Sequence, residues 1–277
     1  MKAVPILLSG LPGQMCQEVL RAAQDQEDIE IYPRALGSER HAGPYASSEG
    51  NFEVVPPAHH RSCLIDAQKS HPGIVVVEFS TPQSVERNVE LFCTVGMPFV
   101  CGTTGSNSEK LSTFVAESST TAVIAVNMAA EIVLLQAMWE WAANEFPGLL
   151  SEAHLKVTES HQSKKRDVSG TAIRLGQSFA KLGMAFDINA VESIRDPERQ
   201  RRLGVPDEFL GGHGWHRYQI DVPKSHTHIE LIHNVCGRSA YARGALLAAH
   251  FLRRKMQEGA SGRCFSMLDV MRGTGSA

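Results

Sequence analysis

The sequence lacks several features that would place it in a specialised class. Its six cysteines, at positions 16, 63, 93, 101, 236 and 264, include no CxxC pair, which argues against a disulfide framework or a zinc cage and favours reduced thiols. No apolar run approaches the roughly 20 residues that span a bilayer, and Val4–Leu8 is too short and too interrupted by Pro5 for a signal-peptide core. We expect a cytoplasmic protein, or a protein of the plastid stroma if its source is a plant or an alga.

A strong charge of either sign is also missing. The 27 Lys+Arg and 30 Asp+Glu residues leave a net charge of −3, so we expect no nucleic-acid partner and no membrane partner. What is present is the composition of an ordinary globular protein, with 277 residues, 43% hydrophobic and 21% charged. This length suffices for two modest domains or for one large domain with an inserted one.

The first half of the chain repeats a unit of apolar strand, turn and helix. The run 73–79 (GIVVVEF) contains a continuous β-branched stretch at 74–77, which is typical of a strand buried on both faces of a parallel sheet. The same reading predicts strands at 3–9, 29–36, 73–79, 97–101 and 122–126 and helices at 16–24, 83–94 and 109–118. This recurrence predicts an α/β fold with an N-terminal, Rossmann-like, doubly wound parallel sheet.

The chain changes character after about residue 130. The elements expected there are helices at 131–146 and 172–182 and strands at 153–158, 185–194, 215–222 and 227–233. They predict an α+β substrate domain with a mixed sheet, and a final helix at 240–256 that returns to the first domain. We therefore expect a dinucleotide-binding domain of residues 1–129 and 242–277, and a substrate-binding and oligomerisation domain of residues 130–241.

The first expected strand leads into a glycine turn, Gly10-Leu-Pro-Gly-Gln-Met15, and then into a helix. This order is typical of a dinucleotide-binding unit: Gly10 would make the tight turn, and Gly13 would let the backbone approach the pyrophosphate. Around the end of the second expected strand, arginines stand at 34 and 40, on either side of Glu39. An arginine at that point can accommodate a 2′-phosphate, which favours NADPH and leaves NADH possible.

The stretch Glu159–Thr171 concentrates residue types that can do chemistry, between an expected strand and an expected helix. His161 can exchange a proton near neutral pH, and Lys165 adds a positive charge. Ser169-Gly170-Thr171 would lie at a helix N-terminus, where free N–H groups and the helix dipole favour a carboxylate. The alternative is a simple helix cap beside a solvated basic face.

The remaining histidines suggest metal ligands only weakly. His59-His60 lies in a polar, proline-flanked stretch, for which a surface loop is the better interpretation. His213-x-x-His216 and His226-x-His228 have no Glu or Cys at ligand spacing, so we expect no metal.

Several motifs follow one another in the order found in one known family. They are Gly-x-x-Gly-x-Met at 10–15, Glu78-Phe-Ser-Thr-Pro82, Pro98-Phe-Val-Cys-Gly-Thr-Thr-Gly105, Asn127-Met128, Glu159-Ser-His-Gln-x-x-Lys-x-Asp-x-Ser-Gly-Thr171 and His233-Asn-Val-Cys-Gly-Arg238-x-x-Tyr241. Over nearly the whole chain they resemble the 4-hydroxy-tetrahydrodipicolinate reductase (dihydrodipicolinate reductase) family of lysine and diaminopimelate biosynthesis. The segment 194–213 is similar to the plant-type branch. Gln162 and Val168 also fit the plant-type branch, because many bacterial members have histidine and proline at these positions.

The resemblance implies an NAD(P)H-dependent oxidoreductase that reduces 4-hydroxy-tetrahydrodipicolinate to tetrahydrodipicolinate, with hydride from the nicotinamide and a proton from His161. It implies that His161 and Lys165 are catalytic, and that the small dicarboxylate substrate is bound by Gln162, Ser169, Gly170 and Thr171. The cofactor contacts that it implies are Gly10, Leu11, Pro12, Gly13, Gln14, Met15, Phe79, Gly102, Thr103, Thr104, Ala125, Val126, Asn127 and Met128.

Two other interpretations stay open at this point. One is a different NAD(P)-dependent reductase of an imine or aldehyde, and the other is a non-catalytic NAD(P)H-binding regulator. The regulator has no need of His161 and Lys165 beside an anion-binding turn. Strands in the second domain also make a homo-oligomer, either a dimer or a tetramer, an expectation.

Overall fold

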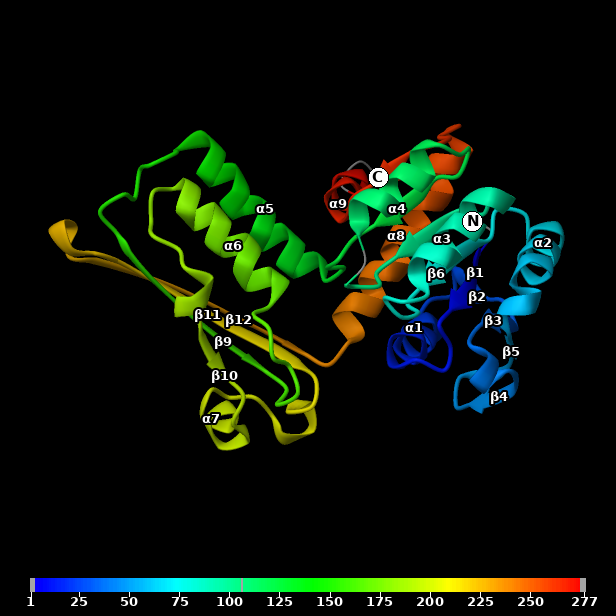
Figure 1. The fold of residues 1–277 in the computed structure, drawn as a ribbon, viewed down its shortest axis with the longest axis horizontal. Helices are drawn as coiled ribbons and strands as arrows, with labels where there is room; N and C mark the ends of the chain where they lie inside the picture. Colours follow the sequence, from blue (N-terminus) through cyan, green and yellow to red (C-terminus); the bar gives the residue numbers. More distant parts are fainter. Residues whose placement is uncertain (1–2, 106, 275–277) are drawn as a thin grey trace. The chain divides into compact units, whose positions relative to one another are not determined.

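A computed structural model of the chain describes residues 3–105 and 107–274. The chain forms two compact units (Figure 1): one comprises Met1–Val133 and Ser239–Ala277, and the other comprises Leu134–Arg238. Each unit has its own sheet and its own hydrophobic core. None of the described helices combines the length and the apolar content that crossing a membrane requires.

The first unit is built on a large, mostly parallel sheet. Its strands are β1 (Val4–Ser9), β2 (Ile29–Ile31), β3 (Arg34–Leu36), β4 (Gly43–Ser47), β5 (Gly50–Val55), β6 (Val75–Glu78), β7 (Phe99–Cys101), β8 (Ala122–Ile124) and β13 (Cys264–Phe265). The order is β13-β8-β7-β6-β1-β3-β5-β4, β2 also pairs with β1, and β4 alone among these described strands runs antiparallel to its neighbour.

Helices cover both faces of this sheet. They are α1 (Gln14–Gln24), α2 (His60–Ser70), α3 (Val85–Val95), α4 (Ser108–Ala116), α8 (Ser239–Gln257) and α9 (Met267–Thr274). In β1, Ile6 and Leu8 pack in the core with α1 and α8, whereas Leu7 packs in the core with α2, α3 and α4. A strand buried on both faces explains the continuous apolar runs of the sequence. The doubly wound fold is confirmed, and α8 belongs to the first unit as expected.

Some elements of the first unit differ from the sequence prediction. The expected strand 29–36 is two short strands that are interrupted at Tyr32 and Pro33, because proline has no N–H to donate to a ladder. The β4–β5 hairpin, α2, β13 and α9 were not predicted. α9 ends at Thr274, and residues 275–277 lie outside the described residues.

The second unit has a smaller, mixed sheet with two helices on one face. Its strands are β9 (His154–His161), β10 (Glu192–Ile194), β11 (His213–Val222) and β12 (Thr227–Cys236), in the order β10-β9-β11-β12. β10 runs parallel to β9, and β11 runs antiparallel to both β9 and β12. The helices on this face are α5 (Ala130–Glu145) and α6 (Gly170–Lys181), whose Leu175 and Phe179 pack against Tyr218.

The remaining segments of the second unit are short. α7 (Pro197–Arg202) lies in the connection 195–214, where no helix was predicted. The expected strand 185–194 is reduced to β10. Among the described residues of both units, short 3-10 helices lie at Glu39–His41, Pro57–His59, Ile188–Ala190, Asp207–Phe209 and Pro223–Ser225.

Candidate active site

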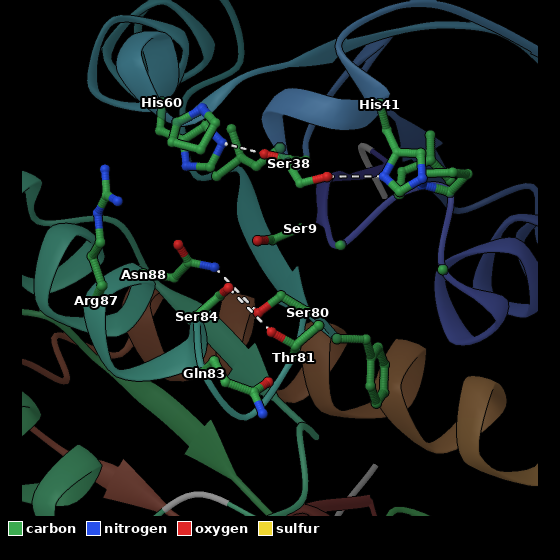
Figure 2. Close-up of a pocket in the computed structure, with 18 residues that line it drawn as sticks. Ser9, Ser38, His41, His60, Ser80, Thr81, Gln83, Ser84, Arg87 and Asn88 are labelled. Atoms are coloured by element: carbon green, nitrogen blue, oxygen red, sulfur yellow. Dashed lines mark hydrogen bonds between the residues drawn. The ribbon is translucent and has the colours of Figure 1, made fainter.

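The glycine turn of the first unit lies at the carboxyl end of β1, beside a cavity of about 410 Å³ (Figure 2). Gly10 has a φ of 116°, and a Cβ there would lie 2.5 Å from the Phe79 carbonyl oxygen. A Cβ at Gly13 would lie 2.7 Å from the Gly10 carbonyl oxygen. Both positions therefore require glycine, and the turn leaves the α1 N-terminus without a side-chain cap. An uncapped helix N-terminus beside a cavity of this size suits a phosphate group.

The expected cofactor residues divide into two groups. Gly10, Leu11, Pro12, Gly13 and Phe79 line the cavity. The expected residues that are not among its lining are Gln14, Met15, Gly102, Thr103, Thr104, Ala125, Val126, Asn127 and Met128. Two residues of this second group, Gly102 and Met128, nevertheless lie close to the Phe79 side chain or to each other.

The turns after β6, β7 and β8 meet at one edge of the sheet. A Cβ at Gly102 would lie 2.3 Å from the Phe79 ring and 3.1 Å from the Met128 side chain. Glu78 was named in the sequence only as part of the motif 78–82, with no role assigned. It is fully buried behind this edge, and its carboxylate accepts a hydrogen bond from the Ser80 N–H at 2.7 Å. Thr103 Oγ1 lies 3.4 Å from the same carboxylate. Burial raises the pKa of the Glu78 carboxyl group, and we assign this residue to holding the turns together.

One sequence interpretation near this cavity is wrong, and one of the two arginines expected near a 2′-phosphate lies elsewhere. His60 is buried at the start of α2, where its Nε2 lies 3.1 Å from the carbonyl oxygens of Gly37 and Val55, so it does not belong to a surface loop. Arg34 pairs with Glu53 at 3.0 Å and with Asp66, and it does not line the cavity.

Polar side chains that the sequence did not single out do line the cavity. Ser38 Oγ lies 2.9 Å from His41 Nδ1, beyond the end of β3, and Arg87 projects from α3 on another side (Figure 2). None of the lining residues carries a carboxylate among the residues that the structure describes. The sequence signal that could have found Ser38 and His41 was their position directly after the second strand.

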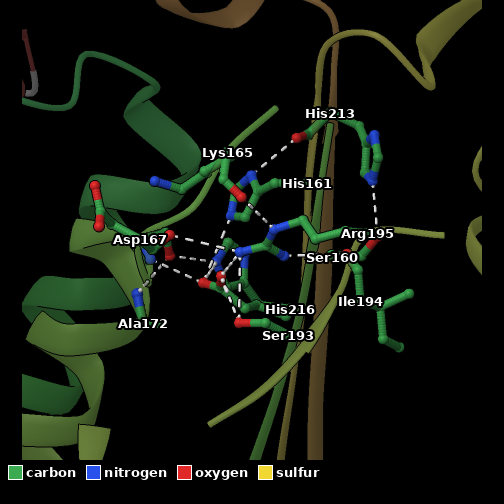
Figure 3. A network of polar contacts seen from close by, with 12 residues as sticks. Ser160, His161, Lys165, Asp167, Ala172, Ser193, Ile194, Arg195, His213 and His216 are labelled. Carbon is green, nitrogen blue, oxygen red and sulfur yellow. Dashed lines mark hydrogen bonds and ion pairs between the residues drawn. The ribbon is translucent and has the colours of Figure 1, made fainter. Parts of the chain in front are cut away.

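In the second unit, β9 and α6 are joined by the loop that the sequence singled out (Figure 3). β9 continues to His161, three residues beyond the expected end at Thr158, so His161 is held by a strand and not by a loop. Ser169 is the N-cap of α6, and its Oγ accepts a hydrogen bond from the Ala172 N–H at 3.1 Å. The expected helix cap is therefore present, and the first turn of α6 begins at Gly170.

The hydrogen bonds of His161 define which nitrogen can move a proton. Its Nδ1 lies 3.0 Å from the carbonyl oxygen of His213. A carbonyl can only accept, so Nδ1 carries a hydrogen and the lone pair of the neutral ring lies on Nε2. Nε2 is buried and has no hydrogen-bond partner among the described residues. Burial lowers the pKa of His161 to about 4, with Lys165 and Arg195 acting in the same direction and Glu159 against it.

Glu159 is the acid beside this histidine, and its side chain has no exposed surface. Its carboxylate accepts hydrogen bonds from Arg195 Nη2 at 2.5 Å and from the Ser169 N–H at 2.9 Å. Burial opposes ionisation, but these two donors outweigh it and lower the pKa of the carboxyl group. Glu159 Oε2 lies 3.7 Å from His161 Nε2, which places a negative charge beside the proton-carrying atom.

Two further histidines come from the neighbouring strands. His216 of β11 pairs across the sheet with Glu159 of β9 and with His233 of β12. Its ring centroid lies 5.1 Å from that of His161 and 4.6 Å from that of His233. Burial lowers the pKa of both His216 and His233. The sequence reading named both residues but gave neither a place in the site, because the strand register that joins them is not visible in spacing.

Glu159, His161 and His216 also place one ligand atom each within 4.8 Å of one another. The acid that the His213-x-x-His216 spacing lacked is thus supplied by another strand. Because Arg195 already pairs with Glu159, and Lys165 is close enough to affect the pKa of His161, the surroundings are cationic. Positive neighbours oppose binding of a metal cation and favour an anion.

The sequence of this chain is similar to known proteins over nearly its whole length. The family models for dihydrodipicolinate reductase match residues 4–128 (N-terminus) and 131–271 (C-terminus). A protein of Oryza sativa subsp. japonica, named probable 4-hydroxy-tetrahydrodipicolinate reductase 1, chloroplastic, is 38% identical over 270 residues, which cover 97% of this chain and 78% of that protein. The Arabidopsis thaliana 4-hydroxy-tetrahydrodipicolinate reductase 1, chloroplastic, is 38% identical over 271 residues, with the same coverage of 97% and 78%.

The fold is also similar to solved structures. A dipicolinate-bound dihydrodipicolinate reductase from Paenisporosarcina sp. TG-14 superposes with a TM-score of 0.66 at 19% identity, covering 95% of this chain and 97% of that one. This likeness concerns the fold. Together with the two family models, which match both units, the sequence relatives establish that the chain belongs to the dihydrodipicolinate reductase family.

Proposed function

We propose that this protein is an NAD(P)H-dependent oxidoreductase that reduces 4-hydroxy-tetrahydrodipicolinate to tetrahydrodipicolinate in lysine or diaminopimelate biosynthesis. The names of the relatives in rice and Arabidopsis support the reaction. The observation that supports the residue roles is the polar network of the second unit. In this network the buried Nε2 of His161 lies near Lys165, whose charge lowers the pKa of His161, and the same loop leads to the capped N-terminus of α6.

The proposed chemistry divides between the cofactor and this chain. When bound, NAD(P)H supplies a hydride to a ring carbon of the substrate. The N–H groups of the first turn of α6, at Gly170 and Thr171, and the charge of Lys165 hold a substrate carboxylate. Gln162 lies in the same loop and is proposed as a further contact. His161 Nε2 then donates the proton that the reduced ring needs.

The pKa of His161, about 4, requires an explanation for a proton donor at neutral pH. A neutral imidazole in the ligand-free protein has no proton on Nε2. A bound dicarboxylate adds negative charge beside Nε2, and nearby negative charge favours the imidazolium form. We therefore propose that binding of the dicarboxylate substrate shifts His161 to its imidazolium form, which can then donate the proton.

The proposal is tested by NADPH oxidation with substrate generated by the preceding synthase, with NADH in parallel. We expect oxidation only with the synthase present, and His161→Ala and Lys165→Ala should each reduce turnover by about 10² or more. Lys164→Met is the matched control, because Lys164 is exposed in the same loop. Wild-type turnover in a folded His161 or Lys165 variant would refute that residue's role, and a wild-type protein that binds NADPH without oxidising it would be a regulator.

For the cofactor, we propose NADPH, with NADH as the weaker alternative. The end of β3 offers Ser38 and His41 to the cavity and no carboxylate from any described lining residue. Dinucleotide folds that use NAD usually place an acid at this point to bind the ribose hydroxyls, and a 2′-phosphate would be repelled by that acid. This argument replaces the one from Arg34.

We also propose a homo-oligomer, a dimer or a tetramer, and a location in the plastid stroma if the source is a plant or an alga, or in the cytoplasm otherwise. β12 is an edge strand of its sheet, and Ile229 and Ile232 on it are exposed. A long unpaired edge is a template for pairing with a second copy. Sedimentation velocity measures the oligomeric state, and cell fractionation tests the location. The chloroplastic names of the plant relatives support the plastid location.

A further inference from the structure

Arg195 lies outside the 159–169 segment in sequence but binds two separate points of it, Glu159 and Lys165. Its Nε donates to the carbonyl oxygen of Lys165 at 2.9 Å, and its Nη2 donates to Glu159 Oε1 at 2.5 Å (Figure 3). The carbonyl oxygen of Asp167 lies 3.5 Å from the same Nη2. We propose that Arg195 is a positioning residue: it fixes the loop between β9 and α6 so that Lys165, His161 and the α6 N-terminus keep the arrangement that binds and protonates substrate. This inference rests on the proposed function.

Glu159 transmits the effect of Arg195 to the end of the loop. One carboxylate oxygen accepts from Arg195 and the other accepts from the N–H of Ser169, which caps α6. Arg195 thus holds the loop at its middle directly and at its end through Glu159. Without the guanidinium group, Glu159 would be a buried carboxylate with no cationic partner at hydrogen-bond distance, which is strongly unfavourable. Glu159 would keep the Ser169 N–H and the Ser193 hydroxyl as donors, but it would lose its charged partner, so its hold on the end of the loop would weaken.

The environment of Arg195 separates it from ordinary surface arginines. Its side chain is 18% exposed, whereas that of Arg199, four positions later, is 52% exposed and pairs with Glu192 on the surface. Exposed ion pairs contribute little to stability or to geometry. Arg199 therefore provides a control of the same residue type in the same segment.

Arg195 also contributes to the charges that surround His161. These are Glu159 on the same strand, Lys165 in the loop, Arg195 itself, His213 and His216 on β11, and His233 on β12. Loss of the Arg195 charge removes one of the two cations that lower the pKa of His161, while Glu159 remains to raise it. A purely structural role would weaken folding without moving this pKa in a fixed direction.

The experiment compares Arg195→Met, Arg195→Lys and Arg199→Met with the wild type. For Arg195→Met we expect the Kd of dipicolinate to rise and turnover to fall by about tenfold or more, because misplaced groups lose catalysis steeply. The Kd of NADPH, which belongs to the first unit, should not change. The imidazole NMR titration of His161 should move to higher pH. Arg195→Lys should keep that titration near the wild-type position but still lose turnover, because an ammonium group cannot bridge the Lys165 carbonyl and the Glu159 carboxylate together.

Several outcomes would overturn the inference. They are wild-type dipicolinate binding and turnover in either Arg195 variant, a loss in Arg199→Met equal to that in Arg195→Met, or an unmoved His161 titration in Arg195→Met. If Arg195→Met does not fold, Arg195→Lys decides the matter through turnover and dipicolinate binding. Absence of any turnover in the wild type would refute the proposed function, whereas dipicolinate binding and the His161 titration would still test Arg195.

Discussion

At the scale of single residues, the chemistry proposed for this protein depends on the protonation of one buried nitrogen. The hydrogen bond from Nδ1 of His161 to the His213 carbonyl fixes the tautomer, so that only Nε2 can gain or lose the mobile proton. Glu159 lies close to this nitrogen but is already paired with Arg195. Burial therefore favours the neutral form of His161, and in the proposed mechanism the negative charge of a ligand shifts it to the imidazolium form.

Proton uptake on ligand binding follows from this arrangement. The pKa of His161 is about 4 without ligand, and a bound dicarboxylate should raise it. Between the two values binding takes up a proton, so affinity for dipicolinate should increase as the pH falls from about 7.5 to about 6. Calorimetry in buffers of different ionisation enthalpy measures the uptake. His161→Gln should abolish it, and an equal uptake in that variant would place the proton elsewhere.

A single substitution should also reverse the proposed preference for NADPH over NADH. Ser38→Asp introduces a carboxylate at the end of β3, where it can bind ribose hydroxyls and repel a 2′-phosphate. We expect the Kd of NADPH to rise by about tenfold or more, and that of NADH to fall or stay constant. Fluorescence titration gives both constants. Ser48→Asp, on the exposed turn between β4 and β5, adds the same charge outside the cavity and should leave the ratio unchanged.

At the scale of elements, α6 combines a structural cap with a proposed binding surface. Ser169 satisfies one N–H of the first turn by accepting from Ala172, which leaves earlier N–H groups for a ligand. Gly170 begins the helix, and a Cβ there would meet no heavy atom within 4 Å. Packing therefore does not require a glycine at this position, whereas the proposed close approach of a substrate carboxylate would.

Gly170→Ala separates these two explanations. Alanine in a helix is more favourable than glycine by up to about 1 kcal/mol, so the free energy of unfolding should stay equal or increase. Dipicolinate should nevertheless bind several-fold more weakly, because the new methyl group covers the N–H groups of the first turn. Gly211→Ala is the control, since a Cβ there also meets nothing within 4 Å. Unchanged binding in Gly170→Ala would remove the helix tip from the substrate site.

At the scale of the whole molecule, the two units differ in their buried histidines with a lowered pKa. Burial lowers the pKa of His161, His216 and His233 in the second unit, to about 4 for the first and the last. In the first unit, His60 is a buried histidine with a lowered pKa. The second unit should thus be the more acid-sensitive part of the chain.

The stability of the second unit should fall on acidification. Unfolding returns these histidines to a pKa near 6.5, so the unfolded chain binds more protons below that pH. The stabilisation is complete above about pH 6.5 and is lost as the pH falls toward 4. At pH 5 the loss should be about 2 kcal/mol each for His161 and His233. Urea unfolding followed by tryptophan fluorescence measures it, because Trp139, Trp141 and Trp215 all lie in the second unit.

A variant and a second probe make this measurement specific. His233→Phe should reduce the difference between pH 7.5 and pH 5, because it removes one of the groups that titrate on unfolding. Far-UV circular dichroism reports on the helices of both units and should show a smaller pH dependence for the transition of the first. Equal acid sensitivity of both transitions would contradict the assignment.

The sequence by itself determined the parts of this protein that depend on local physics. The apolar run 73–79 predicted a strand buried on both faces, the glycines at 10 and 13 predicted the turn, and Ser169 predicted a helix cap; the structure contains all three. The motif 159–171 identified the segment of the proposed chemistry. These features need only neighbours within a few positions along the chain.

Tertiary structure alone decided which distant residues share the site. Strand register places His216 opposite Glu159 and opposite His233, and a one-residue slip would turn all of these side chains to the other face. Arg195 reaches Glu159 across 36 positions of the chain. Ser38 and His41 face the cavity while Arg34 turns to Glu53. Pairing and packing over such separations depend on the whole chain, and for that reason composition and spacing did not reveal them.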